Sequence, residues 1–176
     1  MKFFSKTIKA NILLIVLAII CLKCYSQHNY IKSVKFSFGE DLEKNPMRYV
    51  KINLINELDS CVTCNLETIT THRKRRGVDT TKIDTVYKIN RSDFDSIVDM
   101  YLNIDKYAIT SRMIDTYYFL FHTNSVSLGI ESHCGLINSI TLYNINEKTM
   151  KNQIEPFLTI CRKILLLAKL KPKDYF

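Results

Sequence analysis

Apolar and polar residues alternate along several short stretches in the first half of the chain, and this alternation predicts β-strands with one buried face. In the clearest of them, Val34, Phe36 and Phe38 share one face, while Lys35 and Ser37 share the other. The strands predicted in this half cover residues 31–38, 47–55, 66–71 and 82–89. The connections predicted between them are polar and cover residues 39–46, 59–64 and 72–77.

Two other stretches carry apolar residues at steps of three and four, which is the spacing of a helix with one buried face. The first follows Ser92 and Asp95, a pair that resembles a capping box with Asp in place of the usual Glu. The second spans residues 150–170, where Pro156 should kink the helix or mark a break near residues 153–155. Its apolar stripe comprises Met150, Ile154, Phe157, Leu158, Cys161, Ile164, Leu165 and Ala168.

Between these two helices the chain returns to strands. Residues 117–121 are apolar on both faces, so we expect a covered central strand there. Residues 126–131 are its predicted hairpin partner, with Gly129 as a candidate β-bulge, and residues 139–144 follow a loop as the last strand. The resulting order, β-β-β-β-α-β-β-β-α, predicts the α+β class, with an antiparallel sheet of about six to seven strands and both helices on one face.

The start of the chain differs from the rest in composition. Three lysines lie within residues 1–9, an apolar run of 13 residues fills residues 10–22, and small residues precede a cleavage point after Ser26. A helix of that length reaches about 20 Å, which is short of the roughly 30 Å hydrocarbon core of a bilayer. We therefore predict a signal peptide at residues 1–26 and a single α+β domain at residues 27–176.

Two alternatives for this segment stay open. Cys21 or Cys24 could carry a lipid, although neither follows the small residue that lipidation favours, and the apolar run could remain as an uncleaved anchor. A signal that ends just before Gln27 resembles export signals common among Bacteroidetes, and the resemblance covers only the first 27 residues. We expect a periplasmic or secreted domain that meets the membrane only through the segment before cleavage.

Removal of the signal changes the charge balance. The full chain has 25 Lys and Arg against 17 Asp and Glu, a formal net charge of +8. Four of the lysines lie in residues 1–26, so the exported part has 21 basic against 17 acidic residues, or +4. A charge of this size gives no reason to expect a nucleic-acid partner, and export argues further against one.

Four cysteines follow the signal: Cys61, Cys64, Cys134 and Cys161. An even number in an exported chain makes them disulfide candidates, with three pairings open. The Cys61–Cys64 pair could also be a redox centre, or half of a zinc site completed by His72 or by His133 and Cys134. Strand-like residues follow the pair where a redox thiol needs a helix, so we favour a structural disulfide, with unpaired thiols as the remaining alternative. We expect no metal and no cofactor.

The most concentrated positive charge lies at Arg73, Lys74, Arg75 and Arg76. Such a run is often only a solvated hairpin tip, and the functional alternative is contact with an acidic protein, with anionic lipid or with other envelope groups. The four histidines are scattered and no set of nucleophile, base and orienting group is evident, so we name no catalytic residue.

These observations favour an exported, non-enzymatic binding protein of the cell envelope. Its concrete form is an inhibitor or an immunity-type protein directed against a toxin or an enzyme, and the partner is an unknown protein or envelope component of acidic character. One alternative is a small envelope enzyme or a metal- or thiol-dependent protein that uses Cys61, Cys64, His133 and Cys134. A structural or adhesive accessory domain is the other.

Overall fold

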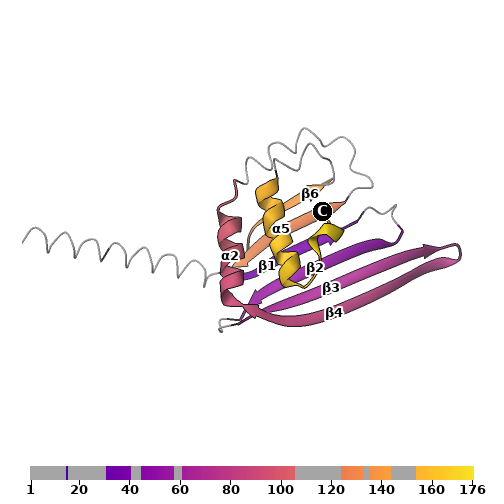
Figure 1. The fold of residues 1–176 in the computed structure, drawn as a ribbon, viewed down its shortest axis with the longest axis horizontal. Coiled ribbons are helices and arrows are strands. Elements are labelled where there is room, and N and C mark those ends of the chain that lie inside the picture. Colours follow the sequence, from indigo (N-terminus) through magenta and orange to yellow (C-terminus); the bar gives the residue numbers. More distant parts are fainter. Residues whose placement is uncertain are drawn as a thin grey trace, which may run out of the picture.

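The alternating stretches of the first half form four consecutive strands, and the rest of the described chain adds two strands and the helices (Figure 1). The computed structural model describes residues 15, 31–40, 45–57, 61–105, 124–132, 135–143 and 154–176. The strands are β1 (Ile31–Gly39), β2 (Met47–Asn56), β3 (Cys61–Lys74), β4 (Gly77–Asn90), β5 (Ser125–Ser132) and β6 (Gly135–Tyr143). The helices are α2 (Arg91–Leu102), α5 (Glu155–Leu167) and the short 3-10 helix η2 (Pro172–Asp174). No helix in this part of the chain is both long enough and apolar enough to cross a bilayer.

All six strands pair antiparallel in one sheet, in the order β4-β3-β2-β1-β5-β6. Both α2 and α5 lie on one face of this sheet (Figure 1), which confirms the predicted α+β class. Over the described residues the order is β-β-β-β-α-β-β-α, and the additional strand predicted at residues 117–121 lies outside them. The predicted hairpin between that stretch and residues 126–131 is replaced by other pairings, because β1 and β6 occupy the two edges of β5.

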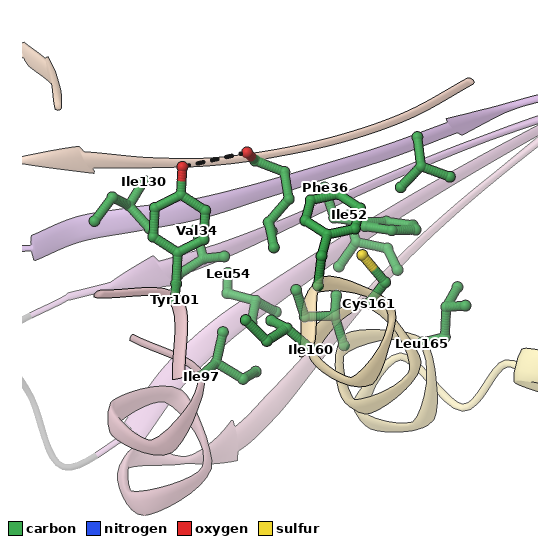
Figure 2. Packing of buried hydrophobic residues seen from close by; sticks show 14 of the residues in the cluster. Val34, Phe36, Ile52, Leu54, Ile97, Tyr101, Ile130, Ile160, Cys161 and Leu165 are labelled. Carbon is green, nitrogen blue, oxygen red and sulfur yellow. Dashed lines mark hydrogen bonds between the residues drawn. The ribbon is translucent and has the colours of Figure 1, made fainter. Parts of the chain in front are cut away.

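The core fills the space between the helices and the middle strands. Register places Phe36 of β1 beside Ile52 of β2 and Leu128 of β5, so the alternating apolar residues of three strands form continuous rows. The helical stripes cover these rows, and Figure 2 shows α2 and α5 side chains directed at the sheet. The hydroxyl of Tyr101 donates to the carbonyl oxygen of Leu128 at 3.5 Å, which satisfies a buried polar group. Burial raises the pKa of Tyr101 to about 12.

Both helices begin differently from the expectation. α2 starts at Arg91 with Asn90 as N-cap and no side-chain cap, so the predicted capping box at Ser92 is wrong. The reason is that β4 runs directly into the helix, which places Ser92 inside the first turn. α5 starts at Glu155 with Pro156 in its first turn, where a missing N–H removes no helical hydrogen bond. The described helix therefore begins within the predicted break, and the part of the helix predicted before it, residues 150–153, lies outside the described residues.

The starts of two strands and the position of one β-bulge also differ from the prediction. β3 begins at Cys61, so the connection predicted at residues 59–64 is largely strand, and β6 begins at Gly135 within the predicted loop. The register shift in β5 falls between Ile130 and Glu131, one residue beyond the bulge predicted at Gly129. Gly129 serves close packing instead, because a Cβ there would lie 3.1 Å from the Asn138 carbonyl oxygen.

The end of the chain folds back over β1 and β2. The rings of Tyr175 and Phe176 meet the ring of Phe38 edge-on, with centroids 5.1 and 6.1 Å apart. Arg48 of β2 donates to the Glu40 carboxylate at 2.9 and 3.2 Å and lies 5.8 Å from the centroid of the Tyr175 ring. The Glu40 carboxylate raises the pKa of the Arg48 guanidinium. These contacts hold the last residues of the chain against β1 and β2.

Candidate functional site

The hairpin of β3 and β4 carries the predicted binding residues beyond the body of the sheet. Each of its strands has 14 residues, and β2 stops pairing with β3 where Met47 lies opposite Thr71. Past that point the hairpin residues pair only with one another, and the tip extends past the ends of the neighbouring strands (Figure 1). Every side chain from residue 72 to residue 84 is exposed. The hairpin is therefore longer than predicted, and its outer part has no role in the core.

Three local features hold the tip in place. Gly77 has a φ of 151°, a conformation that glycine adopts readily, and it follows the turn at Arg75 and Arg76. Asn45, between β1 and β2, bonds the backbone of Arg73 twice: its Nδ2 donates to the carbonyl oxygen, and its Oδ1 accepts from the N–H, both at 2.9 Å. The Lys74 ammonium donates to the Asp79 carboxylate at 2.9 Å. The tip is thus tethered at its base and paired across its strands.

The charged groups of the tip are not equivalent. Lys74 is neutralised by Asp79, whereas the guanidinium groups of Arg73, Arg75 and Arg76 have no ion-pair partner among the described residues. A guanidinium presents a planar fork of donors that matches a carboxylate in two parallel hydrogen bonds. The tip therefore presents three guanidinium groups that can form paired hydrogen bonds with carboxylates of an acidic surface. Binding by these residues stays a prediction.

The cysteines do not form the predicted disulfides. No disulfide joins Cys61, Cys64 or Cys161; Cys61 is exposed and the other two are buried. Cys134 lies outside the described residues. Cys64 lies three positions after Cys61 in β3, so the two side chains point to opposite faces of the sheet. Their Cα atoms are about 10 Å apart, beyond the roughly 7 Å limit for a bridge. Burial raises the pKa of Cys64 to about 11 and that of Cys161 well above its ordinary value. Both therefore stay protonated and unreactive at neutral pH.

The histidines and cysteines also do not converge on a metal. No group of three or more potential ligands occurs in the part of the chain that the structure describes. His72 lies at the exposed end of β3, eight strand residues and about 26 Å from the buried Cys64. The two other suggested ligands, His133 and Cys134, lie outside the described residues.

The face of the sheet opposite the helices carries a feature that the sequence reasoning missed. A shallow depression of about 380 Å³ crosses β2, β3 and β4, lined chiefly by Lys51, Asn53, Asn65, Glu67, Asp84 and Val86. The Oδ1 atom of Asn53 is buried there and has no hydrogen-bond partner. Lys82 lies 3.3 Å from both the Glu67 and the Asp84 carboxylates, which raise its pKa. The alternation of β2 places Lys51 and Asn53 on this face, but only the strand register brings Glu67 and Asp84 beside them.

Comparison of the chain with models of protein families, with curated proteins and with solved structures finds no match in any of the three. The functional argument therefore rests on the geometry of the chain itself. That geometry separates the buried, protonated thiols of the core from the exposed guanidinium groups of the hairpin tip. Among the described residues that were singled out from the sequence, Cys61 and those of the tip are exposed, and the tip alone gathers several charged groups in one place.

Proposed function

We propose that the protein is an exported, non-enzymatic binding protein of the cell envelope that docks onto an acidic protein surface through its basic hairpin tip. The observation that carries the proposal is the position of Arg73, Arg75 and Arg76. All three are exposed on a hairpin that projects past the sheet, and none has an ion-pair partner in the described part of the chain. The predicted signal peptide supports the envelope location.

The tip suits binding because little freedom is lost when it docks. The uninterrupted register of β3 and β4 and the double hydrogen bond from Asn45 fix the backbone that carries the arginines. Preorganised groups reduce the ordering cost of association, and charges at the rim of an interface act mainly on the rate and specificity of encounter. The preferred partner is therefore a protein with clustered carboxylates.

The projecting shape favours a concave partner. A narrow hairpin with exposed side chains on both strands can enter a cleft that a flat sheet face cannot, and active sites of enzymes and toxins are such clefts. We therefore propose an inhibitor or immunity-type protein as the concrete form of the function. In that form the arginines of the tip enter an acidic cleft and block it without any chemistry.

The first test compares two variants with the same loss of charge. Protein purified from cells that express the full chain is immobilised, either as wild type, as Arg73→Ser/Arg75→Ser/Arg76→Ser, or as the control Lys51→Ser/Lys171→Ser/Lys173→Ser. We expect the wild type and the control to retain an acidic envelope protein, and the arginine variant to bind it about tenfold more weakly with a shallower salt dependence. Equal retention by both variants, or none by the wild type, contradicts the proposal.

A second test addresses the class of partner and the inhibitor form. Vesicles of phosphatidylglycerol that capture the wild type but not the arginine variant would assign the tip to anionic lipid instead of protein. If the reading frame immediately upstream encodes a toxic product, co-expression of this chain should relieve the toxicity, and the arginine variant should relieve it less. Equal relief by the arginine variant would remove the tip from the inhibitor mechanism.

A further inference from the structure

The outer edge of β4 is an unusual surface for a protein to leave exposed. β4 ends the sheet, and no described strand pairs with its outer edge (Figure 1). It is 14 residues long, contains no proline and pairs with β3 without a register shift. Val78, Ile83 and Val86 are 67%, 57% and 65% exposed along it. Long, regular and partly apolar edges pair readily with other strands, and proteins usually shorten, bend or charge them.

β4 carries charges of both signs, and within one chain two of the carboxylates at this strand share a single bridging ammonium. Asp84 lies directly opposite Glu67 of β3, so two carboxylates face each other across the strands. Lys82 is the described cation that bridges them, at 3.3 Å from each. Like charges directly opposite are unfavourable, so a second cation beside Asp84 would complete the cluster.

We propose that β4 pairs antiparallel with β4 of a second copy of this chain, about a two-fold axis that passes through Ile83. The axis stands perpendicular to the sheet, so residues that meet across it belong to the same face. Ile83 then lies opposite Ile83 of the second copy, Lys82 opposite Asp84, and Thr81 opposite Thr85. The pairing covers the strand from Gly77 to Ile89 and joins two six-stranded sheets into one.

The charges select this register over its neighbours. With the axis at Ile83, each Asp84 receives the Lys82 ammonium of the other copy, which supplies the second cation. An axis one residue earlier places Lys82 opposite Lys82, and an axis one residue later places Asp84 opposite Asp84, so both neighbouring registers bring like charges together. The preferred register also covers the exposed Val86 with Thr80 of the other copy. This inference does not depend on the role of the basic tip.

Charge-reversal variants test the pairing. Sedimentation or light scattering on the full chain over a range of concentrations measures the dimer dissociation constant of each variant. We expect the wild type to be a dimer, and Lys82→Asp and Asp84→Lys each to raise the dimer dissociation constant about tenfold or more. Mixing the two single variants, or combining them in one chain, restores opposite charges and should restore the dimer. Lys173→Asp makes the same charge change in η2, away from the β4 edge and its charge cluster, and should leave the dimer intact. A monomeric wild type, dimeric single variants or a monomeric mixture overturns the proposal.

Cysteine cross-linking tests the register. In a Cys61→Ser background, Ile83→Cys places two thiols opposite each other on the axis, at a strand separation that allows a disulfide. Oxidation should link this variant into a dimer, whereas Thr85→Cys alone should link poorly and should link well when mixed with Thr81→Cys. Failure of Ile83→Cys to link, or equal linking by Thr85→Cys alone, overturns the assigned axis.

Discussion

Two isoleucines on the same face of the same sheet occupy opposite environments. Ile52 of β2 is 0% exposed beneath the helices, whereas Ile83 of β4 is 57% exposed. Both belong to strands with a clear alternation, and the register places both side chains on the helix-covered side. Alternation therefore predicts which face a residue belongs to, and the position of the helices decides whether that face is buried.

The difference divides the molecule into a covered region and a projecting one. The covered region contains β1, β2, the inner part of β3, β5, β6 and both helices, and its stability derives from apolar burial. The outer part of the β3–β4 hairpin is held by strand pairing and by Asn45. Substitutions in the hairpin are thus expected to affect association, and substitutions in the covered region to affect folding.

The largest contrast should come from a matched pair of truncations. We expect Ile52→Ala to lower the free energy of unfolding by about 2–5 kcal/mol, because it leaves a cavity in a packed core. Ile83→Ala should change it by about 0.5 kcal/mol or less when dilute, monomeric protein is used. Urea denaturation followed by circular dichroism measures both. Similar losses for the two variants would show that the hairpin belongs to the core.

Alkaline pH should act selectively on the covered region. The folded chain holds the Cys64 proton to a pKa of about 11, above the ordinary value of 9.0, so the unfolded chain loses that proton first as the pH rises. By linkage, this contribution to stability is fully present below pH 9 and is lost as the pH rises through 11. Cys161 and Tyr101 are shifted in the same direction. Urea denaturation at several pH values measures the decline, which should be shallower in Cys64→Ala.

A smaller loss of stability is expected from the contact between Glu40 and Arg48, where the end of the chain packs on β1 and β2. Glu40 is almost fully buried and accepts hydrogen bonds from the Arg48 side chain and from its backbone N–H. Glu40→Ala removes these charge-assisted bonds and should cost about 1.5–3 kcal/mol. Glu40→Gln keeps the shape and part of the bonding, so it should cost less. Equal thermal stability of Glu40→Ala and the wild type would show that this contact adds nothing to the fold.

A small and local effect is expected at the base of the projecting tip. Asn45→Ala removes two exposed hydrogen bonds to the Arg73 backbone and should lower the free energy of unfolding by about 1 kcal/mol or less. Its main consequence should be local, as faster amide hydrogen exchange at Arg73 and His72, while the exchange of Ile52 is unchanged. An equal acceleration at all three sites would mean that the hairpin and the core open together.

The parts of the fold that the sequence predicted are those set by local periodicity. Apolar residues recur at every second position in β1 and β2 and at every third or fourth position in α5. The residues of each element therefore specify its own buried face. The edge position of β4 has no such local origin. It arises because β5, which follows α2 in the chain, pairs with β1 and leaves the outer edge of β4 without a neighbouring strand among the described residues. The capping error at Ser92 has the same cause, because β4 continues into α2 without a connection.

The candidate site was predictable to the same limited degree. The charge run at residues 73–76 is visible in the sequence, and its position at a hairpin tip follows from the flanking alternation. The tether from Asn45 left no signal, since a hydrogen bond between a side chain and a backbone 28 residues away follows no period. The predicted disulfide between Cys61 and Cys64 is wrong because both lie within β3, where an extended backbone holds them apart.

The pairing of β1 with β5 also has a consequence for the order of events during folding. Strands β1 to β4 pair with their neighbours in sequence, and β5 and β6 form a hairpin of their own, so both units consist of short-range contacts. In the sheet, the two units are joined by one strand pairing, the seam between β1 and β5, in which Phe36 lies opposite Leu128. Strands β2 to β4 and helix α2 lie between these two strands in the sequence. Closing that long loop carries the main entropic cost before any contact compensates for it. We therefore expect the two units to form quickly and the seam between β1 and β5 to set the folding rate.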